Sequence, residues 1–187
     1  MNRVIVEVGS GDGNNLKSED FLGKKGYTVH LIEPNPLSFK YLEEKTKSIS
    51  NVICHNICIF NKNDYVDFVV DNQWSYIKGI KSPCEVNFSS VGLSATDSQK
   101  GLLIKSKSIK ICDLIKEDTE ILYLDCEGSE GFVLKELCHR PNFISIPIMG
   151  VSGYRNEFSK EIDMWFMFNN YDQTGHTEND LLYKRRV

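Results

Sequence analysis

Residues 4–15 are Val-Ile-Val-Glu-Val-Gly-Ser-Gly-Asp-Gly-Asn-Asn, an apolar β-branched run that breaks into a glycine-rich loop. The apolar run predicts a buried strand, and Gly9, Gly11 and Gly13 predict a tight turn at its end. Such a loop lets a ligand approach the backbone closely, because glycine has no Cβ and tolerates a positive φ. We therefore expect the loop to cradle a nucleoside cofactor.

A second apolar run, Val29-His-Leu-Ile, ends in a single acid, Glu33, and is followed by Pro-Asn-Pro. This pattern predicts a second strand with a carboxylate at its end. A carboxylate in that position can accept hydrogen bonds from both hydroxyls of a ribose. Glu33 is therefore the expected anchor of the cofactor's sugar.

Strand and helix signals alternate along most of the chain, which is typical of a doubly wound α/β sheet of mostly parallel strands. The expected strands are 3–8, 27–33, 51–57, 121–126, 142–148, 171–175 and 180–185. The expected helices are about 15–25, 36–47, 112–117, 129–138 and 156–169. Residues 61–111 interrupt this rhythm and predict a β-rich insertion, with short strands at 65–70, 84–88 and 108–111.

The composition sets limits on size, location and partners. At 187 residues, 41% of them hydrophobic, the chain has the size of one domain, 1–187, with one substantial core. Its net charge of -4 argues against a nucleic-acid partner, because such binding depends on clustered Lys and Arg. No stretch approaches the roughly 20 apolar residues of a membrane span, and no signal-peptide pattern is present. We expect a cytoplasmic protein and leave homo-oligomerisation open.

The cysteines form no CxxC pair, and we expect all six to be reduced, partly buried thiols. A metal site built from Cys54, His55 and Cys58 is a weak alternative, because alternate residues of a strand point to opposite faces. We therefore expect no metal. The six positions are Cys54, Cys58, Cys84, Cys112, Cys126 and Cys138.

The glycine loop favours one nucleoside cofactor over another. A dinucleotide loop of the form GxGxxG needs a third small residue, and that position, counted from Gly9, is Asn14. Glu7 and Asp12 would also add negative charge beside a pyrophosphate. A sulfonium cofactor with an ammonium end is a better electrostatic match, because Glu7 can face the ammonium. S-adenosylmethionine is therefore favoured over NAD, and a purely structural glycine turn is the remaining alternative.

A third motif, LYLDCEGSEGFVLKEL at 122–137, combines a strand with the start of a helix. Its strand should end at the carboxyl edge of the sheet, where open α/β folds bind ligands. Asp125 and Glu127 are two residues apart on an extended segment and can face one pocket. A solvated strand end is the alternative for both acids. Glu130, in the first turn of the helix, is explained equally well by the helix dipole.

Together with VIVEVGSGDGNN, LIEPNP, NVICHNICIF and KSIKICDL, this motif resembles the FkbM family of class I S-adenosylmethionine-dependent methyltransferases. The resemblance implies a Rossmann-like sheet of seven strands with an antiparallel last strand. It also implies O-methylation of a hydroxyl on a small molecule or a saccharide. The cofactor-binding residues that it implies are Glu7, Gly9, Ser10, Gly11, Gly13, Glu33, Pro34, Asn56, Ile57 and Asp125.

The resemblance places Asp125 and Glu127 beside the donor methyl. A hydroxyl acceptor benefits from a base that takes its proton, and either acid is a candidate. His176, in the expected turn between the last two strands, is a third candidate.

Two departures from the family leave other functions open. The chain begins directly at the first strand, so we expect the region 72–101 or a partner subunit to cover the cofactor. Relatives often carry an acid where this chain has Ser145-Ile-Pro147. A non-catalytic S-adenosylmethionine-binding protein and an NAD-dependent oxidoreductase are therefore the alternatives.

Overall fold

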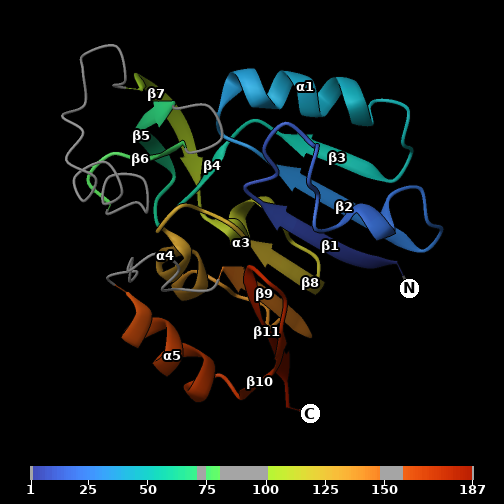
Figure 1. The fold of residues 1–187 in the computed structure, drawn as a ribbon, viewed down its shortest axis with the longest axis vertical. Helices are drawn as coiled ribbons and strands as arrows, with labels where there is room; N and C mark the ends of the chain where they lie inside the picture. The colour runs from blue at the N-terminus through green and yellow to red at the C-terminus, as the bar shows by residue number, and fades with distance from the viewer. Residues whose placement is uncertain (1, 71–74, 81–100, 148–157, 187) are drawn as a thin grey trace.

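The computed structural model describes residues 2–70, 75–80, 101–147 and 158–186 (Figure 1). Its main sheet has seven strands in the order β10-β11-β9-β8-β1-β2-β3. β11 is antiparallel to both of its neighbours, and the other neighbouring pairs are parallel. The predicted α/β fold with an antiparallel last strand is confirmed. The strands are β1 Arg3–Val8, β2 Tyr27–Ile32, β3 Val52–His55, β8 Thr119–Leu124, β9 Phe143–Pro147, β10 Tyr171–His176 and β11 Asp180–Arg185.

Four α-helices are described, and each lies close to an expected helix. They are α1 Pro36–Thr46, α3 Ile111–Leu114, α4 Glu130–Lys135 and α5 Ser159–Phe168. Asn35 caps α1, because its side-chain oxygen accepts a hydrogen bond from the Leu37 N–H. None of the helices in the described ranges is long and apolar enough to cross a bilayer.

The helix expected over 15–25 is wrong. Only a short 3-10 helix, η1 Glu19–Phe21, forms there. Gly23 has a φ of +71°, a left-handed conformation that ends the helical turn directly after Leu22. The Glu7 carboxylate accepts the N–H groups of Lys17 and Ser18 before η1 begins.

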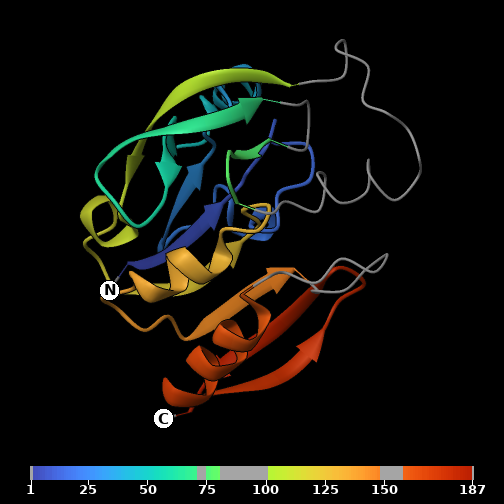
Figure 2. The same cartoon turned by 90° about the vertical axis from the view of Figure 1, so that its left-hand side faces the viewer.

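The two faces of β1 contact different layers. Val4, Val6 and Val8 belong to the core that includes residues of α4 and α5, which Figure 2 shows side by side. Ile5 belongs to the core on the other face, together with Leu42 of α1. Successive strand residues alternate between faces, so Glu7 lies on the face of Ile5. This placement turns Glu7 toward the segment that follows the glycine loop.

The predicted β-rich insertion is confirmed in the part of the chain that the structure describes. It forms a second sheet in the order β4-β7-β5-β6, and the strand expected at 84–88 lies outside the described residues. In Figure 1 the arrowheads of β1, β2 and β8 point toward the side on which this sheet lies. The second sheet can therefore wall off the carboxyl edge of the main sheet. Its strands are β4 Cys58–Ile59, β5 Asp64–Val70, β6 Tyr76–Ile77 and β7 Leu102–Ile109.

The expectation of six reduced cysteines is wrong for one pair. Cys112 in α3 and Cys138 after α4 form a disulfide, with their Cα atoms 5.8 Å apart. The two are 26 residues apart in sequence, so only the packing of α3 against the end of α4 brings them together. Cys54, Cys58 and Cys126 are free thiols.

A histidine pair, of which His30 is buried, links β2 and β3 and predicts a pH-dependent stability. His30 Nδ1 lies 2.9 Å from His55 Nε2, and burial lowers the pKa of His30 to about 4. Between about pH 6.5 and 4 the unfolded chain takes up a proton at His30 that the folded chain resists. Acidification over that window should therefore cost up to about 3 kcal/mol of stability.

The variant His30→Gln isolates this contribution. Urea unfolding at pH 7 and pH 5 should show wild type losing more stability on acidification than the variant. Any buried acid with a raised pKa contributes equally to both proteins and cancels in the comparison. An equal loss in both proteins would contradict the assignment to His30.

Candidate functional site

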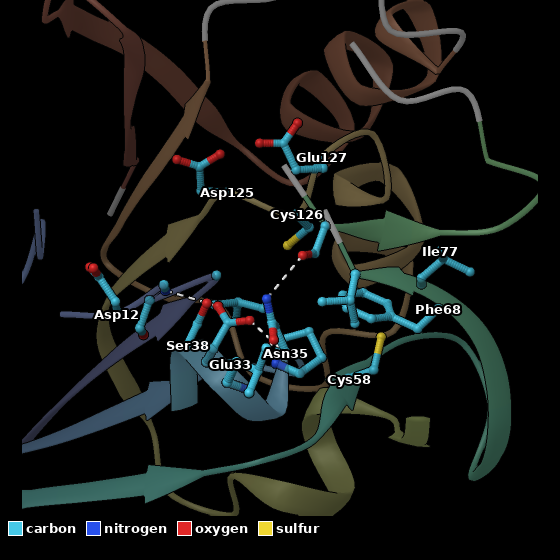
Figure 3. Close-up of a pocket in the computed structure, with 18 of the residues that line it drawn as sticks. Asp12, Glu33, Asn35, Ser38, Cys58, Phe68, Ile77, Asp125, Cys126 and Glu127 are labelled. Carbon is cyan, nitrogen blue, oxygen red and sulfur yellow. Dashed lines mark hydrogen bonds between the residues drawn. The ribbon is translucent and has the colours of Figure 1, made fainter. Parts of the chain in front are cut away.

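A cavity of about 810 Å³ opens at the carboxyl edge of the main sheet (Figure 3). It lies where the strand order reverses, because the chain runs from β1 outward to β2 and β3 and then returns to β8 on the other side of β1. Open α/β sheets bind ligands at such a switch point. The described residues that line it include Gly9, Ser10, Gly11, Asp12, Glu33, Pro34, Asn35, Cys58, Ile59, Phe68, Ile77, Asp125, Cys126 and Glu127.

The glycine loop packs directly against the end of β8. Gly9 has a φ of +87°, and a Cβ added to it would lie 1.9 Å from the carbonyl oxygen of Asp125. Gly11 also has a positive φ, and its N–H points at Glu33. The hydroxyl of Ser10 donates to the Glu7 carbonyl and accepts from the Ile32 N–H, both at 3.1 Å. These contacts fix the loop at the edge of the cavity before any ligand binds.

Gly13 lies one step farther along the same loop. Its φ is +77°, and an added Cβ would come 3.0 Å from Leu42 Cδ1 on α1. The described residues that line the cavity do not include Gly13. The structure therefore places Gly13 against α1, and the expected contact with the cofactor is replaced by a packing role.

Glu33 is a buried carboxylate held from two sides. Its Oε2 accepts the Gly11 N–H at 2.8 Å, and its Oε1 accepts the Asn35 N–H at 2.7 Å. Burial raises the pKa of Glu33 to about 7, against the lowering effect of these two bonds. The side chain is aimed, ordered and able to accept further hydrogen bonds from a ligand's hydroxyls.

Two more acids lie across the cavity from Glu33, as Figure 3 shows. Asp125 follows β8 directly, and Glu127 has a φ of +49° that turns its side chain into the site. Glu130 supports this turn, because its carboxylate accepts the N–H groups of Cys126 and Gly128 at 2.9 and 3.3 Å. The structure therefore brings the two predicted acids together on one wall.

Glu127 differs from an ordinary surface carboxyl in its affinity for a proton. Burial, followed by the charges of Asp125 and Glu130, raises the pKa of Glu127 to about 8. Without a cation beside it, the Glu127 carboxyl holds a proton at neutral pH. A cation bound beside it would drive that proton off, because an opposite charge favours the ionised form.

Glu7 does not lie where the sequence predicts. It is 3% exposed, and its carboxylate accepts hydrogen bonds from the backbone of Lys17 and from the backbone and hydroxyl of Ser18. The described residues that line the cavity do not include it. The expected contact with an ammonium group is therefore replaced by a supporting role under the loop.

The residues expected beside the adenine are displaced by a turn. The strand expected over 51–57 ends at His55, and Ile57 is buried in the main core. The Asn56 amide donates to the backbone carbonyls of Glu33 and Pro34. Cys58 and Ile59 of β4 line the cavity instead, beside Pro34. The apolar residues of 51–57 predict one continuous strand, and the turn between β3 and β4 has no glycine or proline that would reveal it in the sequence.

His176 lies at the end of β10, the edge strand of the main sheet. It is exposed, its Nδ1 lies 3.1 Å from the carbonyl oxygen of Thr177, and it is not among the described residues of the cavity wall. Three strands separate β10 from β1 in the sheet. The structure therefore does not bring His176 together with Asp125 and Glu127.

Metal chemistry finds no support among the described residues, where no three His, Cys, Asp or Glu side chains are arranged to hold an ion. His30 and His55 stack on each other. Burial raises the pKa of the Cys58 thiol to about 12, which makes it a poor ligand at neutral pH.

No family model matches this sequence, and no curated protein sequence matches it. Solved structures do match the fold. The methyltransferase FkbM from Methylobacillus flagellatus aligns with a TM-score of 0.57 and 17% identity, over 98% of this chain and 43% of that one. The fibrillarin from Aeropyrum pernix, solved with natively bound S-adenosylmethionine, aligns at 0.54 and 12%, over 98% of this chain and 66% of that one.

A third match extends the same fold to another enzyme. The ribosomal protein L11 methylase from Lactobacillus delbrueckii aligns with a TM-score of 0.54 and 9% identity, over 100% of this chain and 72% of that one. The chain spans under half of the FkbM methyltransferase and about two thirds of the fibrillarin. These similarities show that the chain has the Rossmann-like fold of S-adenosylmethionine-dependent methyltransferases.

Proposed function

We propose that this protein binds S-adenosylmethionine in the cavity and transfers its methyl group to a hydroxyl of a small molecule or saccharide, as the resemblance to the FkbM family implies. One observation carries the proposal. The glycine loop lies against the backbone of Asp125, and its Gly11 N–H donates to Glu33, so that backbone without side chains lies beside the acids of one cavity. These acids are Asp12, Glu33, Asp125 and Glu127. This surface suits a nucleoside that carries positive charge better than one that carries a pyrophosphate.

Each wall has a part in the proposed reaction. Glu33 accepts hydrogen bonds from the ribose hydroxyls, and Pro34, Cys58 and Ile59 offer apolar contact to the adenine. When bound, the sulfonium supplies both the methyl group and its own leaving group. Holding the acceptor in line with it can lower the barrier by roughly 7–11 kcal/mol. Glu127, rather than His176, takes the proton of the acceptor hydroxyl.

Ligand-induced thermal stabilisation tests the cofactor. We expect wild type to be stabilised by S-adenosylmethionine, by S-adenosylhomocysteine and by 5′-methylthioadenosine, a nucleoside without the amino-acid part, but not by NAD. Stabilisation by NAD alone would favour an oxidoreductase. The absence of any shift with the three sulfur nucleosides at millimolar concentration would refute the assignment.

Glu33→Gln should weaken the binding of all three sulfur nucleosides about 10- to 100-fold, because hydrogen bonds to a charged acceptor are lost. A glutamine also cannot accept from both Gly11 and Asn35 with one oxygen. Isothermal titration calorimetry measures the affinities, with the exposed α1 variant Glu43→Gln as the matched control. Unchanged affinity in Glu33→Gln would remove Glu33 from the ribose site.

A protein that binds the cofactor without turnover is the second candidate. Methylation of broad small-molecule extracts with labelled S-adenosylmethionine separates the two. Tight binding with no labelled acceptor would favour the non-catalytic protein.

A further inference from the structure

Lys17 connects three segments that are far apart in the sequence. Its Nζ lies 3.1 Å from Asp125 Oδ2 and 2.7 Å from Asp180 Oδ1. Its side chain is 22% exposed and that of Asp180 only 9%. The cluster therefore joins the segment after the glycine loop, the end of β8 and the start of β11. Asp125 is its described member that lines the cavity, and Lys17 and Asp180 lie directly behind it.

The backbone on both sides of this cluster is fixed. Glu7 accepts the N–H groups of Lys17 and Ser18, which sets the direction of the Lys17 side chain. Asp180 is held by a turn, because its N–H donates to the Thr177 hydroxyl and its carbonyl accepts the Thr177 N–H. Because both the backbone and the ammonium of Lys17 are fixed, its ion pairs differ from exposed surface pairs, which form and break freely.

Lys17 remains a cation in this setting. Burial acts to lower its pKa, but the charges and hydrogen bonds of Asp125 and Asp180 outweigh burial, so that the pKa of Lys17 is raised. A lysine with a raised pKa does not accept a proton at neutral pH. Its contribution must therefore be a fixed positive charge.

The position of that charge matters because, within the described residues 14–18, no helix begins that could supply one. A helix that begins at a ligand often provides the positive end of a dipole. Here the glycine loop continues in turns, and η1 begins only at Glu19. Lys17 is a described cation beside Asp125, which lines the cavity with a side chain that is 41% exposed.

We propose that Lys17 and Asp125 form a matched pair that recognises the amino-acid end of the methyl donor, with Asp180 as a positioning residue. Lys17 meets the donor's carboxylate, and Asp125, whose Oδ2 is fixed by Lys17, offers Oδ1 to the donor's ammonium. Each charge of the protein's ion pair thus faces the opposite charge of the donor's amino-acid end. The inference rests on the proposed function and assigns Lys17 a specificity role within it.

Calorimetric affinities for three probes test this pair. Lys17→Met keeps the aliphatic stem and removes the charge. It should weaken S-adenosylmethionine and S-adenosylhomocysteine about 10- to 100-fold and leave 5′-methylthioadenosine within twofold of wild type. Lys17→Arg, which keeps the charge, should retain most of the affinity. The exposed neighbour Lys25→Met serves as the control and should change none of the three.

Each other outcome has a distinct meaning. Equal weakening of all three probes would assign Lys17 a purely structural role and overturn the inference, as would unchanged affinity for S-adenosylmethionine. If wild type binds none of the probes, the proposed function itself fails. Asp180→Asn keeps Lys17 and removes one partner, so it provides a second test if Lys17→Met does not fold. It should weaken only the two ligands that carry the amino-acid part, by about threefold or more.

Discussion

Gly9→Ala should be among the most damaging single substitutions in this chain, with a loss of about 3–5 kcal/mol in the free energy of unfolding. Two costs add at this position. The φ of +87° is unfavourable for alanine, and the new Cβ would lie 1.9 Å from the Asp125 carbonyl oxygen. That oxygen belongs to the backbone at the end of β8, so it cannot rotate away as a flexible side chain would. The loop and the strand end must separate.

Gly23→Ala separates the two costs. Gly23 also has a positive φ, of +71°, but a Cβ there would meet no atom within 4 Å. It should lose only the conformational part, about 1 kcal/mol. Thermal unfolding followed by circular dichroism measures both, and Gly9→Ala should lower Tm by about 10 °C or more. Similar losses in the two variants would show that the close approach to Asp125 is not what Gly9 provides.

Gly9→Ala and Gly23→Ala should also differ in cofactor binding. Separation of the glycine loop from β8 would move Gly11 away from Glu33 and widen the gap between Glu33 and Asp125. Where Gly9→Ala remains folded, it should therefore bind S-adenosylmethionine far more weakly than Gly23→Ala does. Gly9→Ala should therefore lower both the stability and the affinity for S-adenosylmethionine, because both depend on the contact between the glycine loop and the end of β8.

The main sheet and the cavity were predictable because they follow from local patterns. The apolar β-branched run Val4–Val8 predicts a buried strand, and the carboxyl ends of parallel strands share one edge. That rule alone brings Gly9, Glu33 and Asp125 together before any contact is known. Asp125 and Glu127 follow from the same placement at the end of β8.

The unpredicted features all depend on contacts between distant segments. Leu16, Phe21 and Leu22 give a genuine apolar signal, and they do pack on the core beside Ile5. They do not form the expected helix, because Gly23 takes a left-handed φ of +71° directly after Leu22. The Glu7 carboxylate holds the backbone N–H groups at 17 and 18, a contact that no periodicity within 15–25 encodes.

The surroundings of Glu7 and Lys17 were not predictable for a related reason. The two-residue period of β1 places Glu7 with Ile5 on the face away from α4 and α5. Its partners there, the N–H groups of Lys17 and Ser18, are determined by tertiary packing. Lys17 carries no motif. Its importance becomes visible only when Asp180, 163 residues further on, lies 2.7 Å from its Nζ.

Glu127→Gln should have the second large effect, a fall of about 10²- to 10⁴-fold in methyl transfer to any hydroxyl acceptor. The raised pKa of Glu127, about 8, means that its carboxyl holds a proton at pH 7 when no cation lies beside it. A sulfonium within a few ångströms favours the carboxylate and drives the proton off. Binding of the donor thus converts Glu127 from an acid into a base.

This proton can be counted without knowing the acceptor. Calorimetry at pH 7 in two buffers of different ionisation enthalpy should show wild type releasing roughly half to one proton on binding S-adenosylmethionine. S-adenosylhomocysteine has a neutral sulfur and should release much less. Ionisation of Glu33, whose pKa is about 7, accompanies either ligand and cancels in the difference. The difference should vanish above about pH 9, where Glu127 is already ionised.

Glu127→Gln should abolish the difference between the two ligands, and the exposed variant Glu44→Gln should preserve it. Loss of the folded state cannot account for the lost proton release, because the substitution of Glu127 should stabilise the protein at this pH. A carboxyl whose pKa is raised from 4.5 to about 8 costs the folded state stability as pH rises through that window. A neutral glutamine escapes this cost and should be the more stable protein at pH 8. A variant that is more stable, binds both ligands and releases no extra proton would identify Glu127 as the group that ionises when the donor binds. An unchanged proton count would contradict that assignment, and the transfer rate of the same variant tests whether Glu127 acts as the base.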